Sequence, residues 1–165
     1  MNQKYEKVLQ SGEYQATKLH YGERRATRSG LLLMTHIEEG IQILVDLDAS
    51  LDAMKAFCLH PLCQADVDLQ RNFRPERYDG DVVCLAMEFR NAANRYLPIH
   101  GPKTSIRLSP LKAVNDMLIA DKVQQRKDLT EYPIRDADER LRVDHYLSRW
   151  LLALGVSQEK YNQQC

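Results

Sequence analysis

Three residues of metal-binding types, His36, His60 and Asp121, lie on separate segments with helical spacing. Asp121 lies three residues past Leu118, on an apolar stripe that also contains Val114. A carboxylate on such a face needs a cation or a metal as its partner, because burying it alone is unfavourable. Imidazole and carboxylate groups suit zinc, manganese or iron, and a helical bundle can bring them together at its centre. The sequence therefore predicts a divalent-metal site made by these three side chains, although a single histidine on an apolar helix is more often an ordinary core residue.

Basic and amide side chains accompany this set. Residues 21–30 form a turn with three arginines, which is typical of a solvated surface but also of a phosphate clamp. A second basic group follows Asp121 directly. We therefore predict that phosphate or substrate contacts come from Arg24, Arg25, Arg28, Lys122, Gln125 and Arg126.

The segment around Asp121 also resembles a family signature. Residues 119–129 read Ile-Ala-Asp-Lys-Val-Gln-Gln-Arg-Lys-Asp-Leu, similar to the Leu-Ala-Asp-Lys-Leu-x-Asn-x-Arg-Asp-Leu signature of the small alarmone hydrolases and RelA/SpoT-type hydrolase domains. These belong to the HD-domain phosphohydrolase superfamily. Their ligands are an early histidine, a His-Asp pair and the aspartate of the signature, which His36, His60 and Asp121 match. The resemblance covers roughly residues 20–155 and implies a metal-dependent phosphohydrolase acting on guanosine or deoxynucleotide phosphates.

The chain departs from the family pattern around the second histidine. The His-Asp pair is replaced by His60-Pro61, and proline supplies no ligand. The family's following Glu-Asp pair becomes Gln64-Ala65, with Asp66 one residue late. Gln64 can orient a water but cannot accept its proton, so Asp66 or Glu88 would have to act as the base. Gln64, Asp66 and Glu88 are therefore the candidate catalytic residues, and the asparagine of the signature is a glutamine here.

Two other functions fit the same residues. A pseudoenzyme would bind a nucleotide or a partner without turnover, with Asp121 paired to protonated His36 or His60 in place of a metal. An interaction module would use exposed helix faces, for example residues 88–96, to bind another protein or a second copy of the chain.

Composition limits the class of protein. The 165 residues predict a single domain, 1–165, with residues 1–10 as a loose or helical lead-in. Lys plus Arg equals Asp plus Glu, 23 each, which argues against a dedicated nucleic-acid binder. No signal peptide or membrane-spanning segment is recognisable, so we expect a cytoplasmic protein with reduced cysteines and no membrane association.

The pattern of apolar residues predicts an all-α fold of about seven helices, which would be an HD-like bundle. Ser11, Ser50 and Asp136 are predicted N-caps, and Ser109-Pro110 resembles a cap followed by proline at the first helical position. Residues 31–48 have apolar residues at helical spacing, and residues 98–109, with His100 and Lys103, are expected to form a loop. Pro61 is expected to bend or end the helix that precedes it. No segment sustains the alternation of a β-strand.

Overall fold

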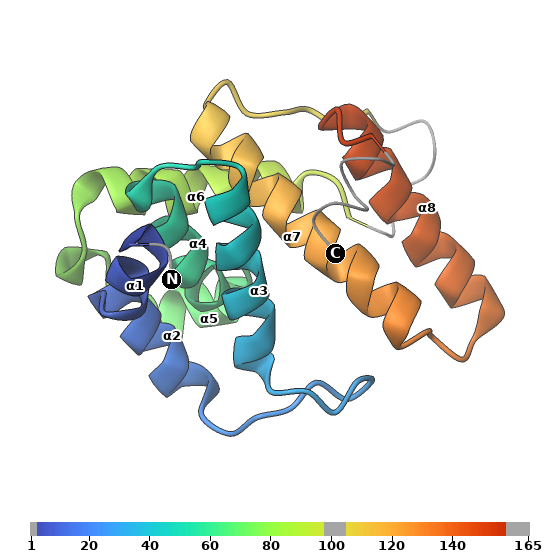
Figure 1. The fold of residues 1–165 in the computed structure, drawn as a ribbon, viewed down its shortest axis with the longest axis horizontal. Helices are drawn as coiled ribbons and strands as arrows, with labels where there is room; N and C mark the ends of the chain where they lie inside the picture. The colour runs from blue at the N-terminus through green and yellow to red at the C-terminus, as the bar shows by residue number, and fades with distance from the viewer. Residues whose placement is uncertain (1–2, 98–104, 158–165) are drawn as a thin grey trace.

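Helices make up the regular structure of the computed structural model, which describes residues 3–97 and 105–157 (Figure 1). The all-α prediction of about seven helices is confirmed: the described part contains eight α-helices, a 3-10 turn and no strand longer than a bridge between Arg25 and Leu32. The helices are α1 (Gln3–Leu9), α2 (Gly12–Tyr21), α3 (Leu33–Asp46), α4 (Leu51–Cys63), α5 (Asp66–Arg71), α6 (Gly80–Asn94), α7 (Lys112–Glu131) and α8 (Ala137–Ala153), and the 3-10 turn η1 (Pro75–Arg77) lies between α5 and α6.

Three predicted N-caps are confirmed by side-chain hydrogen bonds. Ser11 Oγ accepts from the Tyr14 amide at 3.2 Å, and Ser50 Oγ accepts from the Ala53 amide at 3.1 Å. Asp136 Oδ1 accepts from the Glu139 amide at 2.7 Å. Each cap satisfies one amide that the first turn leaves without a helical partner, which typically stabilises a helix by about 1 kcal/mol.

Two predicted helix starts are displaced. The helix carrying Asp121 begins at Lys112 rather than after Ser109, because Ser109 is part of a local turn in which its amide donates to Asn115 Oδ1 at 3.1 Å. Helix α3 begins at Leu33 rather than Leu31, because residues 24–33 fold back on themselves. There the Leu33 amide donates to the Arg24 carbonyl at 2.9 Å.

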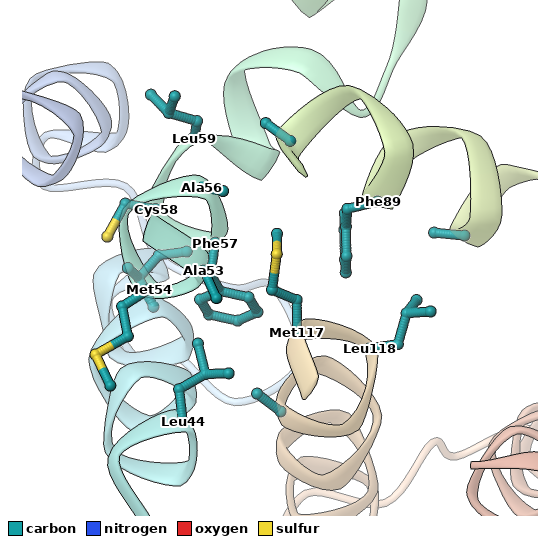
Figure 2. Close-up of a cluster of buried hydrophobic side chains, with 14 of the residues drawn as sticks. Leu44, Ala53, Met54, Ala56, Phe57, Cys58, Leu59, Phe89, Met117 and Leu118 are labelled. Atoms are coloured by element: carbon teal, nitrogen blue, oxygen red, sulfur yellow. The ribbon is translucent and has the colours of Figure 1, made fainter. Parts of the chain in front are cut away.

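Helix α4 is the centre of the core. It packs against α6, α2, α3, α5 and α7, and most of its side chains are buried, as expected for a helix surrounded by others. Figure 2 shows Phe57 of this helix between Met117 of α7 and Leu44 of α3, with Phe89 of α6 beyond. The core therefore holds α3, α4 and α7 together, and these are the helices that carry the three predicted metal ligands.

The two ends of the chain differ in how they join this core. The N-terminal lead-in is a helix: Val8 is completely buried, and Lys4 Nζ lies 2.6 Å from Asp48 Oδ1. At the other end α8 packs mainly along α7 (Figure 1). The buried side chains of α8 are Tyr146, Leu147 and Trp150. Among the described helices, none is both long and apolar enough to cross a bilayer. The predicted loop residues His100 and Lys103, and Cys165, lie outside the described residues.

Candidate metal centre

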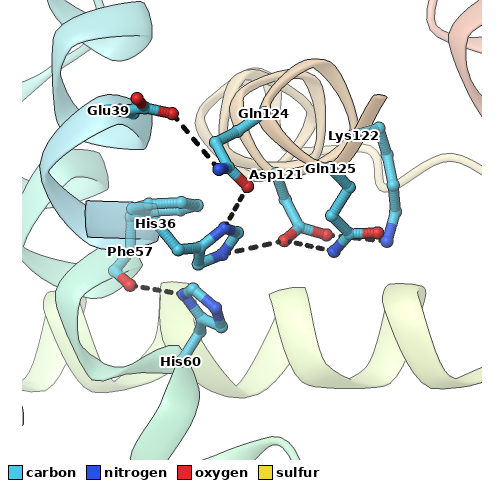
Figure 3. Close-up of polar contacts among 8 residues, drawn as sticks. All are labelled: His36, Glu39, Phe57, His60, Asp121, Lys122, Gln124 and Gln125. Carbon is cyan, nitrogen blue, oxygen red and sulfur yellow. Dashed lines mark hydrogen bonds and ion pairs between the residues drawn. The ribbon is translucent and has the colours of Figure 1, made fainter. Parts of the chain in front are cut away.

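The three predicted ligands meet at one point. His36 lies in the first turn of α3, His60 near the end of α4 and Asp121 in the middle of α7. One ligand atom from each lies within 4.8 Å of the others, and His36 Nε2 is 3.3 Å from Asp121 Oδ1 (Figure 3). Asp121 and His60 are only 2% and 4% exposed, so these two ligands lie in the interior of the protein rather than on its surface.

Pro61 determines which nitrogen of His60 is available. Helix α4 does not end before Pro61 but continues to Cys63, so the Phe57 carbonyl lacks the amide donor that residue 61 would normally supply. His60 Nδ1 takes this place and donates to the Phe57 carbonyl at 2.6 Å (Figure 3). A carbonyl can only accept, so Nδ1 carries the proton and Nε2 keeps its lone pair. The proline that leaves this carbonyl free of an amide donor thus also orients the histidine.

A chain of hydrogen bonds orients His36 in the same sense. Gln124 Nε2 donates to Glu39 Oε2 at 3.2 Å, which turns Gln124 Oε1 towards His36 Nδ1 at 2.5 Å. Lys127 Nζ holds the same Glu39 carboxylate at 2.8 Å. Because Gln124 Oε1 can only accept, His36 Nδ1 is protonated and Nε2 faces Asp121. Both histidines therefore have the supporting hydrogen bond that usually accompanies a metal-binding imidazole.

Asp121 has partners on both of its oxygens. Gln125 Nε2 donates to Oδ1 at 2.8 Å, and Lys122 Nζ lies 2.6 Å from Oδ2 as an ion pair outside directed hydrogen-bond geometry. Lys122 is itself buried, with its ammonium group 5.2 Å and 5.6 Å from the ring centres of Tyr146 and Trp150. The core thus contains a paired acid and base rather than a lone charge.

The electrostatics follow from this arrangement. Burial alone would raise the pKa of Asp121, but the charge of Lys122 and the His36 contact outweigh it, and the pKa lies well below its usual value. Burial would lower the pKa of His36, yet Asp121 and then Gln124 raise it above its usual value. For His60, burial and the nearby charge of His36 lower the pKa to about 4. His60 is therefore neutral near pH 7, as a metal ligand must be.

The residues present fit a divalent cation. Two imidazole nitrogens and one carboxylate form a three-ligand set of the kind that leaves a position open for water or substrate. Bonds of about 2.0 Å at a tetrahedral angle place two ligand atoms about 3.3 Å apart, which is the His36 Nε2–Asp121 Oδ1 distance of 3.3 Å. The other ligand-atom pairs lie within 4.8 Å, so they must approach by up to about 1.5 Å. Lys122 opposes the cation, because its charge already neutralises Asp121.

A cavity of about 270 Å³ opens above the cluster. The three predicted ligands line it, together with three of the other predicted site residues: Arg28, Gln64 and Gln125. The lining residues that were not predicted from the sequence include Tyr21, Thr35, Gln124 and Asp128. Periodicity could have revealed two of them, because positions 121, 124, 125 and 128 share one face of a helix.

The other predicted phosphate contacts do not line this cavity. Arg24 donates to the carbonyls of His20 and Tyr21, and Arg25 donates to the Gly30 carbonyl, so both stabilise the turn itself. Lys122 is enclosed beneath Asp121.

Arg126 is also committed elsewhere. Its NH1 group lies 3.0 Å from Asp144 Oδ1 and donates to Ser148 Oγ at 2.8 Å, which ties α7 to α8.

Neither predicted replacement for the catalytic base joins the cluster. The side chain of Asp66 is 85% exposed and forms an ion pair with Arg90 of α6. Glu88 accepts hydrogen bonds from Ser109 Oγ at 2.9 Å and Asn91 Nδ2 at 3.0 Å. Besides Asp121, the carboxylate that lines the cavity in the described part of the chain is Asp128.

Comparison of the chain with protein-family models, curated proteins and solved structures found no match.

Proposed function

We propose that this protein binds a divalent metal through His36, His60 and Asp121 and acts as a phosphohydrolase on a phosphorylated nucleotide held in the adjoining cavity. One observation carries the proposal: both histidines use Nδ1 for a structural hydrogen bond, which leaves Nε2 of each for a cation beside Asp121. The HD-type signature around Asp121 supplies the substrate class, a guanosine or deoxynucleotide phosphate.

The cavity side chains divide the remaining work. A divalent cation, when bound, would lower the pKa of a water and neutralise charge on a phosphoryl oxygen. Arg28 at the mouth would contact a phosphate by charge-assisted hydrogen bonds. Gln64 and Gln125 would orient water and substrate through their amides. Asp128, not Asp66 or Glu88, would accept the proton, because it is the carboxylate on the cavity wall that is not needed as a ligand.

A second candidate function is a pseudoenzyme that binds the nucleotide without turnover. The observation favouring it is that Asp121 is satisfied by His36, Lys122 and Gln125 without a metal. In the pseudoenzyme, the ion pair between His36 and Asp121 takes the place of the cation, and Arg28 still contacts the phosphate of the nucleotide.

Metal analysis and phosphate release test the proposal together. Purified protein is titrated with Mn²⁺, Zn²⁺ and Fe²⁺ and then assayed with guanosine and deoxynucleotide phosphates. His36→Ala and His60→Ala should abolish both metal binding and hydrolysis, whereas His145→Ala, on the exposed face of α8, should change neither. Asp128→Asn should retain the metal and lose hydrolysis.

The outcomes separate the two functions. Failure to bind any of these metals, together with the absence of hydrolysis, eliminates the hydrolase. A rise in melting temperature with nucleotide under those conditions identifies the pseudoenzyme, because a ligand specific for the folded state stabilises it. No response to any nucleotide would exclude both.

A further inference from the structure

A second cavity, of about 390 Å³, lies beside the ends of α2 and α4. Arg71, Arg74 and Arg77 line one side of it, between the last residue of α5 and the end of η1. The other lining residues are Ala16, Leu19, His20, Leu62, Asn72 and Tyr78. Its size lies within the range of about 300–1,000 Å³ that is usual for small-molecule sites.

The three guanidinium groups are not neutralised by neighbouring acids. In the described part of the chain, no carboxylate lies within 4.0 Å of Arg71, Arg74 or Arg77. The nearby Asp68 instead accepts a hydrogen bond from Asn72 at 2.8 Å. The cavity thus carries three formal positive charges without an ion-pair partner among the described residues, which favours a multiply charged anion.

Part of this basic wall is held in place. Arg74 NH1 donates to the Phe73 carbonyl at 2.8 Å, and NH2 donates to the Arg71 carbonyl at 2.9 Å. Arg74 therefore braces the turn. Arg71 and Arg77 also line the cavity, and each has a planar group with five donors. Guanidinium groups of this kind match the oxygens of a phosphate.

The remaining wall is apolar and aromatic. Leu62 is 2% exposed, and the ring of Tyr78 stacks on that of Phe73 at a centroid distance of 6.1 Å. Leu19, at the edge, is 86% exposed and has no apolar cover. An apolar wall opposite a basic one fits a molecule with both a phosphate and a flat or apolar group.

We infer that this cavity is a separate binding site for a phosphorylated small molecule, with a nucleoside polyphosphate as the class that fits both walls. It contains no carboxylate and a single histidine, so it is suited to binding rather than to hydrolysis. It shares α4 with the metal centre: His60 and Gln64 face the first cavity, and Leu62 between them faces the second. A ligand here therefore contacts the helix that carries a metal ligand, which is a position suited to an effector.

Binding is measured by calorimetry in EDTA, with guanosine triphosphate and inorganic pyrophosphate as the probes. Arg71→Gln/Arg77→Gln should weaken binding of guanosine triphosphate by about tenfold or more, the effect of losing at least one charge-assisted hydrogen bond. The matched control is Arg140→Gln/Arg142→Gln, which removes the same charge from exposed positions on α8 and should leave affinity unchanged. Arg71 and Arg77 are exposed, so folding should not be affected.

A further variant separates this site from the proposed active site. His36→Ala/Arg28→Gln disables the first cavity and should retain binding at the second, whatever the fate of hydrolysis. Loss of binding in this variant, or an equal loss in the α8 control, would overturn the assignment, as would no binding of either probe to the wild type. Tighter binding of guanosine triphosphate than of pyrophosphate supports a role for the Leu62–Tyr78 wall. Equal affinities for the two probes would overturn that role and would show that the cavity recognises only the phosphate groups.

Discussion

Gly40, in the middle of α3, lies against the ring of Phe57 so closely that no side chain fits between them. A Cβ at this position would be 2.3 Å from Phe57 Cε1 and 2.4 Å from Cζ. Phe57 is completely buried, with ring centroids 6.0 Å from His36 and 4.7 Å from His60. Gly40→Ala should therefore displace a ring that touches both histidines of the proposed metal centre.

Two opposing effects set the size of the change. Alanine favours a helix interior over glycine by about 0.8–1.0 kcal/mol, whereas an extra methyl in a filled core costs about 1–3 kcal/mol. The Cβ contacts at Gly40 fall more than 1 Å short of the roughly 3.5–4.0 Å optimum, so the upper part of that range applies. We expect a net loss of about 1–2 kcal/mol, or a melting temperature lower by about 2–8 °C for a chain of this size. Metal affinity should fall as well.

Urea unfolding followed by circular dichroism measures this loss. Gly12→Ala and Gly80→Ala are the controls, because a Cβ at either position has nothing within 4 Å. Phe57→Leu creates room, so adding Gly40→Ala to it should cost less than in the wild type. The reasoning is refuted if Gly40→Ala is as stable as the wild type, or if the two substitutions are simply additive.

Three more predictions concern the polar cluster. Lys122→Met should destabilise the protein by about 3–5 kcal/mol in urea, because it leaves the buried Asp121 carboxylate without its cation; a loss below 1 kcal/mol would contradict the pairing. In metal-free protein, the pKa of His60 in the folded state, about 4, lies below its value in the unfolded state. The free energy of unfolding should therefore be unaffected by His60 above about pH 6.5 and should fall by up to about 3 kcal/mol as the pH falls towards 4. His36, with a raised pKa, acts in the opposite direction, so the test is whether His60→Asn removes the acid-side loss in urea titrations at several pH values. Pro61→Ala restores an amide that competes for the Phe57 carbonyl, so ¹⁵N NMR should show His60 changing from one Nδ1-protonated tautomer to a mixture; an unchanged tautomer would show that proline does not orient the ring.

Helix positions and caps were predictable because their causes are local. Ser11, Ser50 and Asp136 each bond to an amide three residues along, so their roles can be read from neighbouring residues. The predicted helix starts at Ser109 and Leu31 were wrong because another local contact took precedence. Ser109 bonds to Asn115, and Leu31 belongs to the folded turn of residues 24–33.

The sequence alone determined that Asp121 needed a partner, because a carboxylate on an apolar helix face is unfavourable to bury alone, and it indicated His36 and His60 as candidate metal ligands. Only the tertiary structure decided which partners they have. Packing of α8 on α7 encloses Lys122, and Arg90 on α6 holds Asp66 at the surface; neither contact leaves a local signal. Long-range packing, rather than residue type, therefore decides which predicted polar residues join the cluster and which, like Asp66, lie elsewhere.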